Sequence, residues 1–170
     1  EAVARTLAQA RDRRQAAEAA LLRAREEHYR TLAEALPTLV WTCLPSGQCD
    51  FLSKQWIEYT GVPEGEQLGL TWLDRVMHPD DRQRTYDAWM AAVEGRAEYD
   101  LEYRLRRHDD VYRWFKARGV PFKDAAGRIL KWFGTCTDIQ DQRQVLEERE
   151  RLLAAEQHAR HDAEEANRAK

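Results

Sequence analysis

The sequence predicts an α+β fold: a five-stranded antiparallel sheet with short helices on one face, flanked by a long helix at each end of the chain. All six Trp, all five Pro and all eight Gly of the 170 residues lie in the middle of the chain. Both ends are rich in Ala, Glu, Arg, Gln and Leu, as long helices are. Between them come two strand patterns, several short helical patterns and three more strand patterns. An antiparallel sheet with helices gathered on one face satisfies this order with short connections.

The first expected element is a helix from residue 2 to about residue 34, a stretch that contains neither Gly nor Pro. Small or apolar residues recur every seven positions, with a second set four positions after each, which is typical of a coiled-coil seam. The seam residues expected here are Val3, Leu7, Ala10, Ala17, Leu21 and Ala24. Arg14 and His28 interrupt the pattern, so a single amphipathic helix lying on its own domain remains an alternative.

Pro37 is expected to end this helix, because proline donates no backbone hydrogen bond and disfavours helical geometry in the residue before it. Branched and aromatic residues then predict strands over residues 38–44 and 48–53, joined by a turn at 45–47. Residues 54–59 predict a short helix that ends at Gly61, since glycine adopts the left-handed conformation of a helix C-cap. Residues 64–73 predict one or two further helical turns.

The longest central helix is expected to run from Pro79 to about Glu94 and to end at Gly95. We expect Asp80 or Asp81 to cap its first turn, where a carboxylate complements the helix dipole. Three strands follow, over residues 97–107, 111–123 and 128–138. In the first of them apolar and polar residues alternate, which predicts one buried and one polar face.

From residue 139 to 170 Gly and Pro are again absent, and a second heptad pattern places Val145, Leu152 and Ala159 seven residues apart. A lone helix would fit, but heptads on both sides of one domain favour a parallel dimer through the flanking helices. The predicted organisation is a coiled-coil helix over 1–30, a globular domain over 31–140 and a second coiled-coil helix over 141–170.

Composition excludes several classes of partner. The net charge is −3 with acids and bases interspersed, so no basic face is present to bind nucleic acid. Three cysteines without a CxxC pair fit a reducing, cytoplasmic location. No apolar run approaches the ~20 residues that cross a bilayer, so we expect no membrane contact by this segment. The chain starts at Glu1 and ends within a helical pattern, which indicates a fragment whose parent protein could still be membrane-anchored.

No set of residues forms a pattern typical of a catalytic or metal centre. The histidines are scattered, and none stands in a metal-binding spacing such as HExxH. They are His28, His78, His108, His158 and His161. We therefore expect no metal and no enzymatic activity in this chain.

Several short segments together suggest a family. They are Trp56-Ile-Glu-Tyr-Thr-Gly61, His78-Pro-Asp-Asp-Arg82, Glu102-Tyr-Arg-Leu-Arg-Arg107, Tyr112-Arg-Trp-Phe115 and Gly134-Thr-Cys-Thr-Asp-Ile139. This succession resembles a PAS domain, in the PAS fold-3 type subclass common in bacterial sensor histidine kinases. The resemblance implies a sensory and dimerisation module of a two-component histidine kinase, relaying a signal through coiled-coil helices to a kinase domain absent from this chain. Two alternatives remain: a constitutive structural adaptor without ligand, and a PAS module coupled to a diguanylate cyclase.

The resemblance also implies a signal relay at Asp138, Ile139 and Gln140. Asp138 matches the acidic residue of the family's Asp-Ile-Thr signature, which pairs with an arginine and links the sheet to the outgoing helix. Arg104, Arg113 and Arg118 are the candidate partners. Gln140 stands where the family usually has Thr, which leaves the second hydrogen bond of that junction open.

The same comparison predicts no cofactor. Flavin-binding relatives carry a cysteine motif where this chain has residues 69–74, and Cys136 stands where they place a flavin-contacting Gln. Haem-binding relatives use a His on the long helix, and residues 82–94 contain none. The aromatic interior either fills a core or lines a pocket for a small apolar or aromatic ligand. The candidate lining residues are Trp41, Phe51, Trp56, Tyr59, Trp72, Tyr103, Trp114, Trp132 and Cys136.

Overall fold

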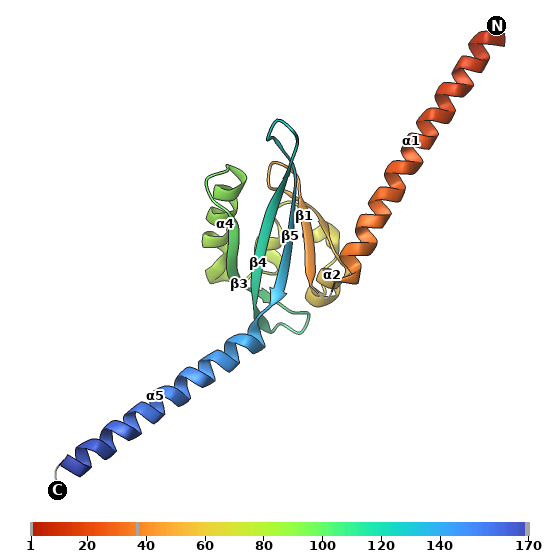
Figure 1. Cartoon of the computed structure of the whole chain (residues 1–170). Helices are drawn as coiled ribbons and strands as arrows, with labels where there is room; N and C mark the ends of the chain where they lie inside the picture. Colours follow the sequence, from red (N-terminus) through yellow and green to blue (C-terminus); the bar gives the residue numbers. More distant parts are fainter. Residues whose placement is uncertain (1, 37, 169–170) are drawn as a thin grey trace.

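The computed structural model describes residues 2–36 and 38–168, without the side chains of residues 2–8, 26, 29 and 166. Five strands form one antiparallel sheet in the order β2-β1-β5-β4-β3. Helices α2, α3 and α4 pack beside it, whereas α1 and α5 extend away from it in opposite directions (Figure 1). The predicted fold class is confirmed. The elements are α1 Ala2–Ala35, β1 Leu39–Cys43, β2 Cys49–Leu52, α2 Lys54–Thr60, the 3-10 helix η1 Glu64–Glu66, α3 Trp72–Arg75, α4 Pro79–Val93, β3 Tyr99–Arg106, β4 Tyr112–Lys123, β5 Ile129–Asp138 and α5 Gln140–Arg168.

The inner face of the sheet is built around Trp41 of β1. The strand register aligns Trp41 with Gly134 of β5, Gly134 with Gly119 of β4, and Gly119 with Tyr99 of β3. The indole lies over both glycines, and a Cβ added at Gly134 would stand only 2.0 Å from the Trp41 Cζ2 atom. Glycine at these positions therefore makes room for the largest side chain of the core.

The N-terminus of α4 differs from the expectation that Asp80 or Asp81 caps it. The cap is the side chain of His78, whose Nδ1 accepts a hydrogen bond from the backbone N–H of Asp80 at 3.2 Å. Asp81 is buried and instead joins α4 to β3, accepting hydrogen bonds from the backbone N–H and the guanidinium of Arg104 at 2.9–3.0 Å. Arg84 adds a fourth donor to Asp81 at 3.0 Å. The carboxylate was expected to act locally, but it serves a tertiary contact.

The flanking helices leave their predicted seams exposed. On α1 the seam residue Leu21 is 64% exposed, and on α5 Val145 and Leu152 are 68% and 60% exposed. The alanines Ala10, Ala17, Ala24 and Ala159 are exposed as well. The side chains of Val3 and Leu7 lie outside the described residues. In residues 2–36 and 38–168, no helix is both long and apolar enough to cross a bilayer.

Candidate functional site

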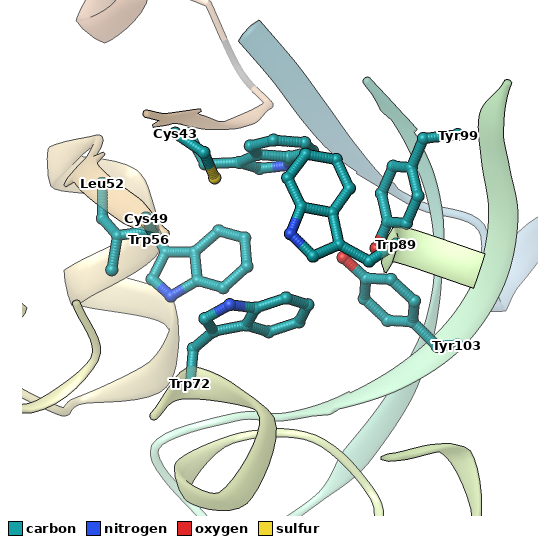
Figure 2. A pocket seen from close by; sticks show the side chains of 9 residues that line it. Cys43, Cys49, Leu52, Trp56, Trp72, Trp89, Tyr99 and Tyr103 are labelled. Carbon is teal, nitrogen blue, oxygen red and sulfur yellow. The ribbon is translucent and has the colours of Figure 1, made fainter. Parts of the chain in front are cut away.

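The sheet and the helices enclose a small interior cavity lined almost entirely by apolar side chains. Figure 2 shows the rings of Trp56, Trp72, Trp89, Tyr99 and Tyr103 converging on one space. Many of these rings meet edge to face, the arrangement that aromatic quadrupoles favour. The full lining is Trp41, Cys43, Cys49, Leu52, Trp56, Trp72, Trp89, Tyr99 and Tyr103.

Trp89 of α4 stands at the centre of this aromatic cluster. Its ring centroid lies 5.4 Å from that of Trp41, 4.7 Å from that of Tyr99 and 5.1 Å from that of Trp132. Its indole Nε1 donates a hydrogen bond of 2.8 Å to the carbonyl oxygen of Gly47, in the turn between β1 and β2. One side chain thus ties the long helix to the hairpin and to the sheet.

The cavity leaves about 10 Å³ for the centre of a water-sized molecule. That is at the lower limit of the space that one water needs, on the order of 10–15 Å³. Beside the lining residue Trp56, the buried Gln67 amide accepts a hydrogen bond from the Trp56 Nε1 at 2.8 Å and donates to Thr60 and Val62. A guest larger than water requires the indoles to change rotamer.

Four of the predicted lining residues, Trp41, Trp56, Trp72 and Tyr103, line the cavity. Three others lie in or beside the surrounding core. Trp132 packs on Trp89, Tyr59 packs on Phe115 with centroids 5.0 Å apart, and the Cys136 Sγ contacts the Tyr103 hydroxyl at 3.1 Å.

Phe51 and Trp114 were expected in the interior but lie on the opposite face of the sheet. Successive side chains of a strand point to opposite faces, and their neighbours Leu52 and Phe115 are the buried ones. The guanidinium of Arg30 covers the Phe51 ring at 5.4 Å. A strand that contains two adjacent large apolar residues gives no local signal for which of them faces inward.

Five lining residues were not predicted: Cys43, Cys49, Leu52, Trp89 and Tyr99. A signal for Trp89 is present in the sequence, because Asp81, Thr85, Trp89 and Ala92 share one helical face, and all four are buried. Because two of the four residues, Asp81 and Thr85, are polar, this buried face is not apparent from apolar residues alone.

Burial keeps the interior hydroxyls and thiols neutral. Burial raises the pKa of Tyr59 to about 12 and that of Cys136 to about 12. The pKa values of Tyr99 and Tyr103 lie well above their ordinary range, first because of burial and then because of the neighbouring Cys136 thiol. The interior therefore carries no ionised thiol or phenol at these four positions near neutral pH.

A second site lies where β5 passes into α5. Asp138 accepts a hydrogen bond from the Nε of Arg113 at 2.7 Å, and the same guanidinium reaches Asp141 at 2.8 Å. Arg113 is thus the partner among the three candidates. Its pKa is raised further above its usual value by the hydrogen bond with Asp138, so it stays charged.

Gln140 supplies the second hydrogen bond of this junction. Its Oε1 accepts from the backbone N–H of Trp114 at 3.1 Å, and its own backbone N–H donates to Asp138 at 2.9 Å. The backbone N–H of Ile139 donates to the Trp114 carbonyl at 2.9 Å. All three predicted relay residues therefore bond to Arg113 or Trp114 of β4, at the point where β5 passes into α5.

One turn later Arg143 fixes α5 to the outer face of the sheet. Its guanidinium lies 4.2 Å above the ring of Trp114 and 2.6 Å from the carboxylate of Glu102 on β3. Where α1 enters the domain, the Gln55 side chain of α2 donates to the Leu36 carbonyl at 3.2 Å, just beyond α1. Both flanking helices thus join the domain through polar side chains.

Comparison with known proteins places this architecture in a family. The PAS_3 family model, described as PAS fold, matches residues 50–136, about half of the chain. This chain belongs to the PAS fold family. Its PAS domain includes β3, β4, most of β5 and the helices that line the cavity.

Two curated relatives are similar over most of this chain. An uncharacterised protein, y4lL, of Sinorhizobium fredii is 36% identical over 128 residues, which is 75% of this chain and 15% of that protein. The peroxide stress-activated histidine kinase mak1 of Schizosaccharomyces pombe is 34% identical over 122 residues, 71% of this chain and 7% of that kinase. The chain therefore spans a small part of the relatives that it matches.

Among solved structures, a sensory box histidine kinase/response regulator from Burkholderia thailandensis superposes with a TM-score of 0.54 at 27% identity. The match covers 76% of this chain and 97% of that one. This chain is thus a PAS sensor domain related to those of histidine kinases.

Proposed function

We propose that this PAS domain is the sensory and dimerisation module of a two-component histidine kinase. It passes a signal from its sheet, through α5, to a kinase domain beyond this chain. The observation that carries the proposal is the junction at the start of α5. Through Asp141, Gln140 and Arg143 the helix is fixed to Arg113 and Trp114 of β4 and to Glu102 of β3, so a change in the sheet alters the direction in which α5 leaves.

The junction is suited to switching because its contacts are polar and partly exposed. Such ion pairs contribute about 0–1 kcal/mol each, and two arrangements of α5 then differ by only a few kcal/mol. A small rearrangement in the sheet is enough to exchange one arrangement for the other.

The exposed seams support dimerisation through the flanking helices. Val145, Leu146, Leu152 and Leu153 form one apolar stripe along α5 that no other part of the described chain covers. An isolated helix in water gains little from such a stripe, whereas a second copy of the chain buries it. We propose a homodimer in which equivalent helices pair in parallel.

Sedimentation at rising concentration tests the dimer. Leu152→Glu is expected to shift the chain to monomers, because it places a charge in the seam. Ala154→Glu introduces the same charge on the face of α5 opposite the apolar stripe and should leave the dimer intact. A wild-type chain that stays monomeric at high concentration would remove the basis of the proposal.

The relay is tested by spin-label distances between the two copies of Ala155→Cys. Gln140→Ala is expected to shift the distance distribution, because it breaks the contact with Trp114. Gln142→Ala, exposed on the same helical turn, is the control. Identical distributions in both variants would refute the relay. In the full-length parent, autophosphorylation on His supports a kinase output, and formation of cyclic di-GMP from GTP would replace it by a diguanylate cyclase.

The packed cavity favours a second candidate function, a structural adaptor that relays movement without binding a ligand or cofactor. Space for about one water at most supports it. Thermal unfolding in the presence of indole distinguishes the two, since a compound that binds the folded state raises the midpoint. No shift supports the adaptor, and a saturable shift supports a ligand-binding sensor.

A further inference from the structure

Two cysteines face each other across the first hairpin of the sheet. Cys43 of β1 and Cys49 of β2 are direct Cα partners in the antiparallel register, and both side chains line the interior cavity. Both are free thiols and nearly buried, at 4% and 5% exposure. Their side chains fill part of the core, and the relay at the start of α5 does not involve their thiols.

The backbone around Cys49 shows which kind of cross-strand pair this is. The N–H of Cys49 donates to the Gly69 carbonyl at 2.9 Å, and the N–H of Gly69 donates back to the Cys49 carbonyl at 2.7 Å. Both polar groups of Cys49 thus point away from β1, so Cys43 and Cys49 form a non-hydrogen-bonded pair. In a regular ladder such pairs hold their Cα atoms about 4.5 Å apart, within the range of about 4.4–6.8 Å that disulfides span. The register shifts between Thr42 and Cys43, but the two thiols remain in hydrogen-bond contact.

The third thiol cannot compete for either partner. Cys136 lies opposite Leu39 in the register of β1 and β5, four residues before Cys43. At about 3.3 Å per residue the separation along the sheet is about 13 Å, far beyond disulfide reach. The geometry therefore singles out one pair among three cysteines.

We propose that Cys43 and Cys49 are a redox-active dithiol, which a hydroperoxide oxidises to a reversible intramolecular disulfide. One thiolate attacks the hydroperoxide, the O–O bond breaks, and an alcohol or water leaves while a sulfenic acid forms. The second thiol then attacks the sulfenic sulfur, an S–S bond forms and water leaves. In total two thiols lose two electrons and two protons, and ROOH is reduced to ROH and H₂O.

The surroundings set the speed of this step and connect it to the rest of the core. The pKa of Cys43 is raised, first by its hydrogen bond with Cys49 and then by burial, so little of it is ionised at neutral pH. Oxidation is therefore slow while the core is closed. The two cysteines flank the turn that contains Gly47, the residue bonded by Trp89. A disulfide fixes this turn at the point where α4 and the sheet meet.

Peptide mapping of the whole chain, before and after hydrogen peroxide and followed by alkylation, tests the proposal without any substitution. Residues 31–54 form one tryptic peptide that holds Cys43 and Cys49, and residues 132–143 form another that holds Cys136. After oxidation the first peptide should lose about 2 Da and take up no alkyl group, because two hydrogens have left. The second should still be alkylated, and dithiothreitol should restore both thiols of the first.

Cys136→Ser should leave this reaction unchanged, and Cys43→Ser or Cys49→Ser should abolish it. Both cysteines of the first peptide remaining alkylatable after peroxide would overturn the proposal. So would a disulfide that joins two chains or requires Cys136.

That this oxidation is the input of the sensor rests on the proposed function. Hydrogen exchange of residues 140–145 in the reduced and oxidised chain separates the two ideas. A disulfide that leaves this exchange unchanged removes its role as input while the site itself stands. If no disulfide forms but Gln140→Ala still shifts the spin-label distances, the thiol site is refuted and the proposed function stands.

Discussion

Replacing Gly134 by alanine is the sharpest test of how the interior is filled. The added Cβ would stand 2.0, 2.2 and 2.5 Å from three atoms of the Trp41 indole. Carbon atoms in contact lie about 3.5–4.0 Å apart, so the ring has to retreat by about 1.5 Å. Trp89 and Tyr99, with centroids 5.4 and 5.8 Å from that of Trp41, stand on its other sides and leave little room for this movement.

The expected cost follows from these distances. Overpacking a core by one methyl group costs about 1–3 kcal/mol, and a clash with an enclosed indole belongs at the upper end of that range. The lower entropy of the unfolded alanine chain returns about 0.4–1 kcal/mol. We expect Gly134→Ala to lower the free energy of unfolding by about 2 kcal/mol or more.

Urea unfolding followed by circular dichroism measures this change. Gly65→Ala is the control, because an added Cβ there meets nothing within 4 Å, and its effect should stay within about 0.5 kcal/mol. In a Trp41→Leu background, Gly134→Ala should cost about 1.5 kcal/mol less than in the wild type, since the atoms that it strikes are gone. Equal midpoints for Gly134→Ala and Gly65→Ala would show that Trp41 does not rest on β5 and that the interior is open.

Three further outcomes are expected. Asp81→Asn should lower the free energy of unfolding at pH 7 by about 3 kcal/mol, because it leaves Arg104 without its buried anion, whereas Asp80→Asn at a 75% exposed side chain should change little. Burial alone would raise the pKa of Asp81, but the hydrogen bonds from Arg104 and Arg84 lower it below its ordinary range. The stabilisation by ionised Asp81 is therefore complete above about pH 3.9, the pKa of an Asp in the unfolded chain. Urea titrations should show that the difference in free energy of unfolding between wild type and Asp81→Asn shrinks below about pH 4. Asp138→Asn should speed hydrogen exchange at residues 140–143 several-fold and leave exchange in β1 unchanged, because it weakens the bond to Arg113. Asp162→Asn, far along α5, is the control. Equal exchange at residues 140–143 in the two variants would contradict a role of Asp138 in holding α5. Trp114→Leu should cost about 1 kcal/mol in urea unfolding through the lost cation–π contacts with Arg143 and Arg104. In an Arg143→Leu background its cost should be smaller, because only the Arg104 contact is left to lose.

Much of this architecture is encoded locally and was predictable. The alternation within β3 follows from neighbouring residues, because burial on one face of a strand requires apolar side chains at every second position, although the strand itself is shorter, Tyr99–Arg106, than the expected 97–107. Pro79 and Gly61 mark helix ends through their own backbone preferences. Such signals survive in any tertiary setting, so the order of elements and the fold class could be derived from the sequence.

Partner choice depended on residues far apart in the chain. Arg104, Arg113 and Arg118 were equal candidates for Asp138, but Arg104 is bound by the buried Asp81 and Arg118 by Asp100. Arg113 remains beside Asp138 because the register of β4 and β5 places it there. No local sequence pattern indicates which carboxylate each of these arginines binds.

The sequence by itself determined an antiparallel sheet with short helices between two long helical segments, since periodicity and turn residues act through adjacent positions, and its motifs resemble those of a PAS domain. Only the tertiary structure decided that Trp41 fills the space above Gly134, that Asp81 crosses to β3, and that Cys43 meets Cys49. Each of these depends on strand register and on the volume left by distant side chains, and both are fixed only when the whole core packs at once.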